Sequence, residues 1–511
     1  MSTVTSWISM HARRTPDRIA VEDLAFDRTI SYGELSRRVD ALAGHLAAVR
    51  GVGRGDRVAV LSRNSHHVIE IQYACAALGA IFVPLNWRLS AAELTDIGRD
   101  CAPAVLIGES FLAEKADAVT SALGVPGLVW LSEAGGPDAY EAALAAAVPA
   151  VPAAPAVPVV VDTSEPWTII YTSGTTGTSK GVIISHASAE ATMLGILVGT
   201  RLHTDATTLT ILPYCHVAGL NFYTNPTLYL GARVVVMREF SPRTVLDQLT
   251  ARKVPLTHFG GVPAVLQAVT LLPEWPEVRL ENLVTLVGGA PVATSLVQEW
   301  AAHGSPPQTV YGISEAGACV LLIPAGQETD HPGSVGLPLM QASVVIADDT
   351  GTEVPAGTVG EVLVSGPSVT PGYWRNPALT AQSIDERGRL HTGDAAYADE
   401  DGYIHIVDRF KDMYISGGEN VYPAEIENVL YQHPAVAEAA VVGLPDERWG
   451  EVGHAFIVPR DGQEIDPEDI RAFVRARLAP FKTPHHVSTM AALPRNTTGK
   501  ILKRELKAGR H

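Results

Sequence analysis

The chain has 511 residues, 46% of them hydrophobic, and a formal net charge of −17 at pH 7. This length allows large buried cores and is too great for one ordinary domain, so at least two domains are expected. The negative charge disfavours nucleic acid and anionic lipid as partners, and any nucleotide must therefore be held by local donors.

Cysteine usage and the chain ends indicate a compartment. The four cysteines lie far apart and form no C-x-x-C pair, which fits neither a disulfide framework nor a zinc site. The first residues carry no basic-then-apolar signal, and the last ones are Ala-Gly-Arg-His rather than Ser-Lys-Leu. A cytoplasmic location is therefore expected.

Helical and strand patterns alternate along the N-terminal part. Leu35, Val39 and Leu42 recur at helical spacing, and the strand-like segment 57–61 follows. Residues 142–161 are apolar throughout, but their regularly spaced prolines are typical of polyproline II and predict a strap rather than a membrane span. The alternation predicts an α/β fold with a large multi-lobed N-terminal domain, in which helices flank β-sheets.

Residues 171–181 form the most informative segment, because they combine hydroxyls, glycines and one lysine. Glycines let backbone N–H groups approach phosphate oxygens, hydroxyls add donors, and Lys180 adds a mobile positive charge. The spacing excludes a Walker A loop, because the residue five after Gly174 is Ser179. Strand-like segments on both sides favour a hairpin-like connection over the alternative, a Ser/Gly-rich surface linker. The predicted phosphate-binding residues are Thr172, Ser173, Gly174, Thr175, Thr176, Gly177 and Lys180.

A charged run at residues 408–412 follows a strand-like segment and predicts a domain boundary. We expect an N-terminal domain at 1–407, a hinge at 408–411 and a small, mobile α+β domain at 412–511. The elements expected in the small domain are helices at 424–431 and 467–478 and strands at 439–442 and 455–458.

Further motifs follow the loop along the chain. They are Leu-Pro-Tyr-Cys-His-Val-Ala-Gly at 212–219, Val-Gly-Gly-Ala-Pro at 287–291, Tyr-Gly-Ile-Ser-Glu-Ala-Gly at 311–317, His-Thr-Gly-Asp at 391–394, a long block at 408–427 and Pro-Arg-Asn-Thr-Thr-Gly-Lys-Ile-Leu-Lys at 494–503. In order and spacing the set resembles the motifs of acyl-CoA synthetases in the adenylate-forming superfamily, which also contains firefly luciferase and nonribosomal-peptide adenylation domains. The resemblance covers essentially the full length. It implies two half-reactions in one site: a carboxylate and ATP give an acyl-adenylate and pyrophosphate, and a thiol then displaces AMP.

The resemblance implies a nucleotide site. Tyr311 would stack on adenine, Asp394 would accept hydrogen bonds from the ribose, and Arg409 would add a donor. Glu315 would ligate Mg²⁺ between the phosphates, since a hard cation prefers carboxylate and phosphate oxygens. Taken singly, each of these residues could instead have an ordinary structural role. The other residues assigned to this site are Gly289, Ala290 and Pro291, which would shape the purine slot, and Gly312.

Three more residues are assigned to catalysis. Lys500 resembles a lysine that contacts both the substrate carboxylate and the α-phosphate and stabilises charge on phosphorus. His216 resembles a mobile aromatic gate between the acyl pocket and the α-phosphate, and a structural role is equally open for it. Ser314 stands where the family usually has threonine, so a hydroxyl donor to the α-phosphate is kept with weaker positioning.

The second half-reaction requires movement, because a site that first holds Lys500 must later admit a thiol. The resemblance implies a hinge at Lys411, about which the small domain rotates. Gly417 and Gly418 would then line a pantetheine tunnel, where a side chain would block the thiol arm. Weaker candidates for contacts with coenzyme A are Trp449, Phe481 and Lys482.

The acyl pocket is inferred from the segments 212–219 and 285–291. Neither contains a carboxylate that could pair with an amino-acid substrate or an arginine that could bind a dicarboxylate. Their small apolar residues predict a roomy cavity and therefore an aryl, cyclic or medium-chain hydrophobic acid. The assigned pocket residues are Tyr214, His216, Ala218, Gly219 and Gly288.

The leading interpretation is a complete carboxylate–CoA ligase that uses ATP, Mg²⁺ and coenzyme A. A ligase that loads the phosphopantetheine of a carrier protein is the alternative with a different acceptor. An enzyme specialised for one half-reaction, or a non-catalytic binding protein, is a third possibility. Two departures keep specialisation open: Ser314, and Ser179 where proline commonly precedes the loop lysine. Nothing in the sequence specifies a luciferase-like substrate or an oligomeric state.

Overall fold

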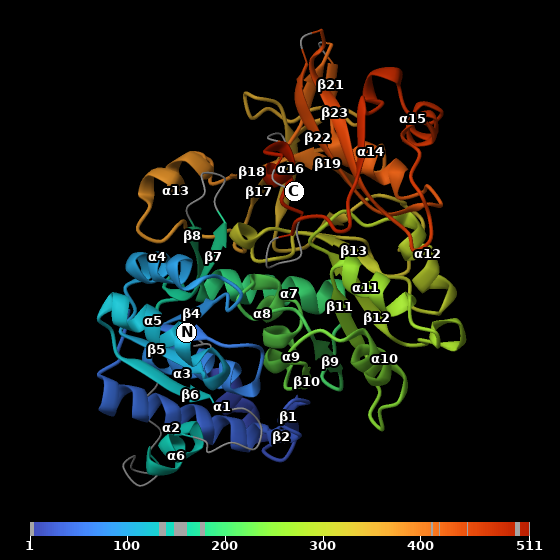
Figure 1. Ribbon diagram of the computed structural model, residues 1–511. Coiled ribbons are helices and arrows are strands. Elements are labelled where there is room, and N and C mark those ends of the chain that lie inside the picture. The colour runs from blue at the N-terminus through green and yellow to red at the C-terminus, as the bar shows by residue number, and fades with distance from the viewer. Residues whose placement is uncertain are drawn as a thin grey trace.

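The computed structural model describes residues 5–131, 139–147, 161–173, 179–409, 412–417, 419–446, 448–495 and 501–509. Within these residues the strands form four sheets with helices packed around them, which confirms the α/β class (Figure 1). Within the same ranges, no helix combines the length with the hydropathy that a bilayer-spanning segment needs. The prediction of a strap over 142–161 is wrong for residues 142–147, whose alanine-rich sequence belongs to a helix, α6 (Ala139–Ala147). Residues 148–160 of the predicted strap lie outside the described ranges.

A six-stranded sheet ends in the hairpin that bears the predicted phosphate loop. Its order is β6-β5-β3-β4-β7-β8, and every pair is parallel except the last. The strands are β3 (Arg57–Leu61), β4 (Ile81–Leu85), β5 (Val105–Glu109), β6 (Gly127–Leu131), β7 (Pro166–Ser173) and β8 (Ser179–Ser185). The neighbouring helices are α2 (Tyr32–Arg50), α3 (His66–Leu78), α4 (Ala91–Cys101), α5 (Ala113–Leu123) and α6 (Ala139–Ala147).

Helix α2 shows why the sequence pattern was informative. Ser31 caps its first turn by accepting a hydrogen bond from the Glu34 N–H, and Gly51 ends it in the left-handed conformation, with φ +66°. The apolar residues at helical spacing, Leu35 and Leu42 among them, are fully buried against the core. The predicted helix and the following strand at 57–61 are both confirmed.

A nine-stranded sheet carries two of the predicted nucleotide-binding segments at the ends of neighbouring strands. Its order is β15-β14-β13-β12-β11-β9-β10-β1-β2, with a parallel centre and antiparallel edges. The strands are β1 (Ile19–Asp23), β2 (Arg28–Ser31), β9 (Thr207–Thr210), β10 (Arg233–Val236), β11 (His258–Gly261), β12 (Val284–Gly288), β13 (Gln308–Tyr311), β14 (Leu321–Leu322) and β15 (Leu337–Pro338). The associated helices are α1 (Thr5–Arg14), α7 (His186–Gly199), α8 (Val217–Asn221), α9 (Thr224–Leu230), α10 (Pro242–Thr250), α11 (Pro263–Thr270) and α12 (Thr294–Ala302). Because β12 and β13 are parallel, the loops that follow them leave the same edge of the sheet, where ligands of α/β proteins commonly bind.

A four-stranded antiparallel sheet leads to the predicted boundary. It contains β16 (Ser343–Ala347), β17 (Gly360–Ser365), β18 (Leu390–Ala398) and β19 (Ile404–Arg409), with α13 (Pro377–Ser383) between β17 and β18. The strand expected at 403–407 extends two residues further, because Asp408 and Arg409 pair with Ala395 and Asp394 of β18. Half of the predicted hinge at 408–411 is therefore regular strand, and Lys411 lies outside the described residues.

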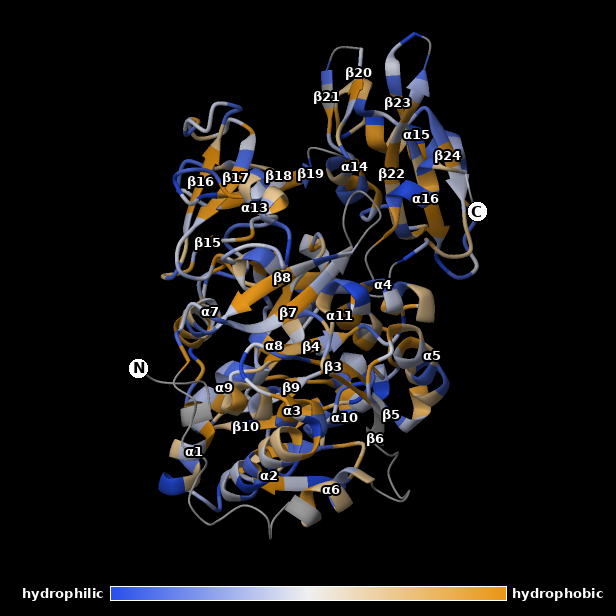
Figure 2. Ribbon diagram, turned by 90° about the vertical axis from the view of Figure 1, so that its left-hand side faces the viewer, coloured by the Kyte–Doolittle hydropathy of each residue, from blue (hydrophilic) through white to orange (hydrophobic). Residues whose placement is uncertain are grey.

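The last hundred residues form the expected α+β arrangement, which lies above the large sheets in Figure 1. Its sheet contains β20 (Tyr414–Ser416), β21 (Glu419–Val421), β22 (Val436–Asp446), β23 (Gly450–Pro459) and β24 (His486–Thr489). The helices are α14 (Pro423–Leu430), α15 (Pro467–Arg475) and α16 (Lys503–Lys507). Figure 2 shows hydrophobic residues along β22 and β23, where α14 and α15 bury them. Both predicted helices and strands are confirmed, although α15 ends three residues before the expected position.

Candidate active site

The hairpin of β7 and β8 places the predicted phosphate loop. Thr172 pairs with Lys180 across the two strands, and Ser173 pairs with Ser179. The predicted hairpin is therefore confirmed, and the surface-linker alternative is excluded for its arms. The loop residues Gly174, Thr175, Thr176 and Gly177 lie outside the described residues.

Lys180 contacts two side chains from distant parts of the chain. Its Nζ lies 2.6 Å from Glu315 Oε1 and 3.0 Å from the hydroxyl of Tyr373. The same hydroxyl donates to Glu315 Oε1 over 2.8 Å. The three groups form a closed triangle, and Glu315 and Tyr373 are only 8% and 6% exposed.

Both charged members of the triangle are ionised near neutral pH. Burial acts to raise the pKa of Glu315, but the charge of Lys180 and the hydrogen bonds from Lys180 and Tyr373 hold it below its ordinary value. Burial acts to lower the pKa of Lys180, but the Glu315 carboxylate raises it above its ordinary value. Each charge therefore compensates the other in a partly dehydrated setting.

The Glu315 carboxylate fits a hard divalent cation. Within the described residues, its hydrogen bonds with the side chains of Lys180 and Tyr373 both reach one oxygen, Oε1. The carboxylate lies beside the arm of the hairpin that leads from the predicted phosphate loop. Proteins commonly bind Mg²⁺ through one or two carboxylates together with substrate phosphates. The residue present is thus suited to magnesium that arrives with a nucleotide.

A second cluster joins three residues predicted for the nucleotide site. The Tyr311 hydroxyl donates to Asp394 Oδ2 over 2.6 Å, and Arg409 Nε lies 2.9 Å from Oδ1. Asp394 and Arg409 face each other in the register of β18 and β19. Burial and the Asp394 charge raise the pKa of Tyr311 well above its ordinary value, so its hydroxyl stays protonated and donates.

The turns after β12 and β13 bring the remaining residues predicted for the nucleotide site to the same edge of the sheet. Gly289 has φ +78°, a conformation that strains an L side chain, and Ala290 and Pro291 beside it are exposed. A Cβ atom at Gly312 would collide with the Ala318 carbonyl. Ser314 and Glu315 lie on a short 3₁₀ turn, η3 (Ser314–Ala316), which begins two residues after this glycine.

The segment 212–219 is packed more tightly than its composition suggested. A Cβ atom at Gly219 would collide with the Pro213 carbonyl, and one at Gly288 would collide with the Val310 carbonyl. These two glycines are therefore explained by close backbone approach, and they give no evidence for a roomy cavity. Tyr214 beside them is buried, and Ala218 is partly exposed.

His216 immediately precedes α8 and is held neutral. Burial, with a smaller contribution from the charge of Arg88, lowers its pKa to about 4. Its Nε2 atom is inaccessible and has no hydrogen-bond partner in the described part of the chain. A neutral ring with an unused nitrogen is compatible with the predicted gate role.

The predicted coenzyme A residues that the structure describes all belong to the small C-terminal region. Gly417 has φ +62°, its N–H donates to the Trp449 carbonyl over 2.8 Å, and a Cβ atom there would lie 3.0 Å from the indole ring. Trp449 is 41% exposed and Phe481 38%, whereas Lys482 binds both carboxylate oxygens of Glu425 at 2.6 and 2.7 Å. In this structure Gly417 therefore contacts Trp449, and the ammonium of Lys482 is engaged in an ion pair with Glu425. Gly418 and Lys500 lie outside the described residues.

Two protein-family models match segments that contain most of the residues described above. The sequence profile of the AMP-binding enzyme family matches residues 8–374, and that of the AMP-binding enzyme C-terminal domain matches residues 425–500. The chain belongs to the AMP-binding enzyme family. The two matched ranges include both clusters described above except for Asp394 and Arg409, which lie between them.

Similar proteins span the whole of this AMP-binding enzyme. It is 40% identical to a feruloyl-CoA synthase from an Amycolatopsis species over 505 residues, 98% of each chain. It is 36% identical to an indoleacetate–CoA ligase from Aromatoleum aromaticum, covering 99% of this chain and 97% of the other. It is also 36% identical to the fatty acid–[acyl-carrier-protein] ligase ScoC from Streptomyces coeruleorubidus, covering 99% and 96%. Among solved structures, ATP-bound MatB from Rhodopseudomonas palustris superposes with a TM-score of 0.88 at 30% identity, covering 99% of both chains.

These similarities confirm the predicted family and the prediction of an AMP-forming acid–thiol ligase. Sequence reasoning missed Tyr373, which lies 193 residues from Lys180 and 58 from Glu315 in the chain. Its only local signal is the Gly372-Tyr373-Trp374 sequence, and aromatic residues are ordinarily core residues.

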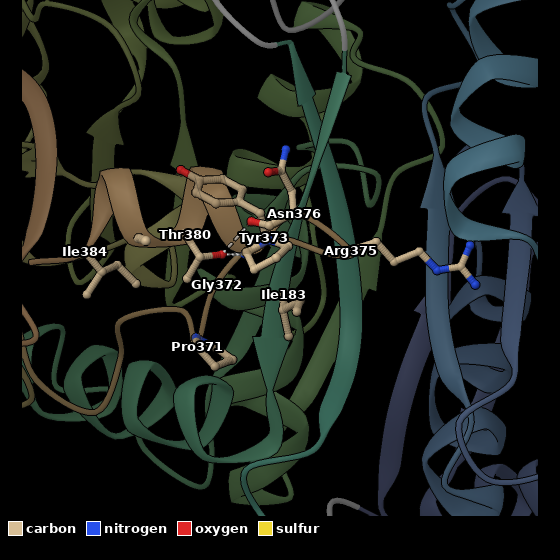
Figure 3. Close-up of a pocket in the computed structure, with 10 residues that line it drawn as sticks. Ile183, Pro371, Gly372, Tyr373, Arg375, Asn376, Thr380 and Ile384 are labelled. Atoms are coloured by element: carbon tan, nitrogen blue, oxygen red, sulfur yellow. Dashed lines mark hydrogen bonds between the residues drawn. The ribbon is translucent and has the colours of Figure 1, made fainter.

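An open hollow of about 490 Å³ lies beside Tyr373 (Figure 3). Ile183, Pro371 and Ile384 line it together with Thr380, whereas the side chain of Arg375 extends away toward α4 and donates to the Asp100 carbonyl. Tyr373 therefore lines the hollow and also belongs to the triangle with Lys180 and Glu315.

Proposed function

We propose that this AMP-binding enzyme is an ATP-dependent carboxylate–CoA ligase that activates a hydrophobic aryl, cyclic or medium-chain acid. One observation carries the proposal: the short segment from Tyr311 to Glu315 joins the Asp394–Arg409 cluster to the Lys180 cluster. A ribose and a polyphosphate that are part of one nucleotide would meet these two clusters at once. The feruloyl-CoA synthase and indoleacetate–CoA ligase relatives support an aryl or cyclic acid.

In the first half-reaction, a carboxylate oxygen of the acid attacks the α-phosphorus of ATP, and pyrophosphate leaves. Lys180 binds the terminal phosphates and Ser314 donates to the α-phosphate. Glu315 would hold Mg²⁺, which supplies charge neutralisation to the phosphates when bound. Lys500 stabilises the negative charge that develops between the acid and the α-phosphate.

In the second half-reaction, the thiol of coenzyme A attacks the acyl carbon and AMP leaves. We propose that residues 412–511 move as a unit about Lys411, so that Lys500 withdraws and Gly417 and Gly418 approach the acyl-adenylate. Trp449 and Phe481 supply exposed aromatic surface for the coenzyme. We propose that the boundary between the two domains follows residue 407.

A carrier-protein ligase is the second candidate, and one observation favours it. The ScoC relative is a fatty acid–[acyl-carrier-protein] ligase that aligns with almost the whole chain. The chemistry at phosphorus is the same for both acceptors, and the difference lies in how the phosphopantetheine thiol is delivered. We also propose a reducing, cytoplasmic compartment, which is supported by four buried free cysteines, Cys75, Cys101, Cys215 and Cys319.

The test is to incubate purified protein with ATP, Mg²⁺, coenzyme A and a panel of aryl, cyclic and medium-chain acids, and to measure AMP and thioester. Preformed acyl-adenylates and a phosphopantetheinylated carrier protein are run in parallel. Thioester formed from free acid and coenzyme A supports the complete ligase and ranks its substrates. Adenylate without CoA thioester, but with loaded carrier, supports the second candidate. Absence of both adenylate and thioester with every acid contradicts the proposed activity.

A further inference from the structure

Tyr373 lies between Lys180 and Glu315, with which it forms the phosphate cluster, although it belongs to none of the motifs that identified the site. Its hydroxyl accepts a hydrogen bond from Lys180 and donates one to Glu315. The Lys180 ammonium also lies 4.6 Å from the centre of the Tyr373 ring, within the range of a cation–π contact. The Tyr373 hydroxyl is therefore hydrogen-bonded to both charged side chains.

The backbone around Tyr373 ties the two halves of the phosphate cluster together. The Trp374 N–H donates to the Gly181 carbonyl over 2.7 Å, next to Lys180. The Thr370 N–H donates to the Glu315 carbonyl over 2.7 Å. The segment 370–374 therefore links β8 to η3 through backbone hydrogen bonds. These bonds hold the backbone next to Lys180 and the backbone of Glu315 at a fixed separation.

Two further contacts anchor the backbone of Tyr373. Its N–H donates to Thr380 Oγ1 over 3.0 Å, at the edge of the hollow in Figure 3. Val182 forms a bridge with Tyr373, so the backbone of the tyrosine is in register with the strand that carries Lys180. These contacts fix the direction in which the ring enters the cluster.

The triangle has a consequence for nucleotide binding. A phosphate that attracts Lys180 removes one of the two partners of a buried carboxylate, and an unpaired buried charge is costly. Tyr373 can keep its bond to Glu315 after Lys180 has left, because its hydroxyl is both donor and acceptor. Since Lys180 and Tyr373 both reach Oε1, the second carboxylate oxygen can meet a cation without breaking either bond.

We propose that Tyr373 is a positioning residue that keeps Glu315 oriented while Lys180 exchanges the carboxylate for a nucleotide phosphate. This inference rests on the proposed function, and it specifies a group that acts through Glu315 in nucleotide binding and adenylation only. Thioester formation from a preformed acyl-adenylate requires no polyphosphate, so it is independent of Tyr373.

The test compares Tyr373→Phe with wild type and with Tyr403→Phe, a matched control. Tyr403 also uses its hydroxyl for one side-chain hydrogen bond, to Gln327, outside the phosphate cluster. Affinity for ATP with Mg²⁺ is measured by calorimetry, and Mn²⁺ bound with ATP is measured by electron paramagnetic resonance. We expect about tenfold weaker ATP and Mn²⁺ binding in Tyr373→Phe, from loss of one hydrogen bond to a charged group. Thioester formation from preformed acyl-adenylate stays within about twofold of wild type.

A double-mutant cycle with Glu315→Gln separates positioning from general structural damage. If Tyr373 acts through the carboxylate, Tyr373→Phe adds little to the loss of ATP affinity caused by Glu315→Gln. Additive losses, unchanged ATP affinity in Tyr373→Phe, or equal losses in the two half-reactions would overturn the proposal. If Tyr373→Phe does not fold, Thr380→Val, which removes the acceptor for the Tyr373 N–H, is expected to weaken ATP binding about twofold with the second half-reaction unchanged.

Nucleotide binding is measured without acid or coenzyme A. A wild-type protein that binds ATP but forms no thioester would therefore overturn the proposed ligase activity without deciding the role of Tyr373, which the binding data decide on their own.

Discussion

The carboxylate of Asp394 is held on one side by the Tyr311 hydroxyl, at 2.6 Å, and on the other by Arg409. Tyr311 reaches it from the end of a parallel strand in the nine-stranded sheet, and Asp394 belongs to the antiparallel sheet of β16–β19. The bond therefore joins the two sheets at the point where we place the ribose and adenine. The proposed nucleotide site therefore depends on the contact between these two sheets, because Tyr311 and Asp394 belong to different ones.

Replacing Asp394 should weaken ATP binding strongly. Asp394→Asn removes a charged partner of Arg409 and weakens the bond from Tyr311, and hydrogen bonds to charged groups contribute about 1.5–3 kcal/mol. We expect a loss of ATP affinity of about 10- to 100-fold, measured by calorimetry. The control is Asp385→Asn, which breaks a similar contact with Arg389. Equal ATP affinities in the two variants would contradict the assignment.

Substitution of Gly417 should separate the two half-reactions. Gly417→Leu places a side chain against the Trp449 ring, in the position proposed for the pantetheine arm. We expect the rate of adenylate formation to stay within about twofold of wild type and the rate of thioester formation to fall at least about 100-fold. Single-turnover assays measure both rates. The reduction corresponds to a barrier increase of about 2.7 kcal/mol.

Gly462 provides the matched control for backbone strain. It also has a left-handed backbone, with φ +73°, but nothing lies within 4 Å of a Cβ atom there. Gly462→Leu should therefore destabilise the fold by about 1–2 kcal/mol and spare both half-reactions. Loss of thioester formation in both variants would mean that strain, and not obstruction of a tunnel, explains the Gly417 result.

Lys482 is expected to affect coenzyme A and not adenylation. In this structure its ammonium binds Glu425, and a partly exposed ion pair of this kind contributes about 0–1 kcal/mol to stability. We predict that Lys482→Ala raises the KM for coenzyme A about three- to tenfold, leaves adenylate formation unchanged and lowers the Tm only slightly. Glu425→Gln, which releases the lysine, should not raise that KM. If both variants behave alike, the ion pair matters and a contact with coenzyme A does not.

Mild acid should destabilise the protein. Burial lowers the pKa of His186, His216 and His258 to about 4, below the ordinary value of 6.5 that these groups recover on unfolding. The unfolded chain then binds more protons between these values, so stability falls as pH decreases from about 6.5 to about 4. Thermal unfolding between pH 7.5 and 4.5 should show a steadily decreasing Tm.

The histidine prediction has its own control. His258→Asn should reduce the slope of Tm against pH in this range, whereas His485→Asn, at an exposed position, should not. A wild-type Tm that is constant between pH 7 and 5 would contradict the prediction, as would equal slopes in all three proteins.

Much of this protein could be predicted from local patterns. The phosphate hairpin follows from the strand-like segments on both sides of a connection rich in Gly, Ser and Thr. Helices such as α2 follow from apolar spacing and end caps that lie within one segment. The motifs around Tyr311, Glu315, Asp394 and Arg409 also identified residues that the fold brings together. Tyr311 ends a strand and Glu315 lies on the turn that follows it, whereas Asp394 and Arg409 face each other across two paired strands.

What the sequence alone determined is therefore the chemistry of each segment: its hydroxyls, glycines and charges, and the family to which their order belongs. Only the tertiary structure decided how segments meet, since those contacts depend on sheet order and register over long separations. It placed the Tyr373 hydroxyl on Lys180 and Glu315, paired Lys482 with Glu425, and filled the space beside Gly219 and Gly288 with backbone. A glycine in a sequence shows that a side chain is missing, and only packing shows whether a ligand or a neighbouring strand uses the space.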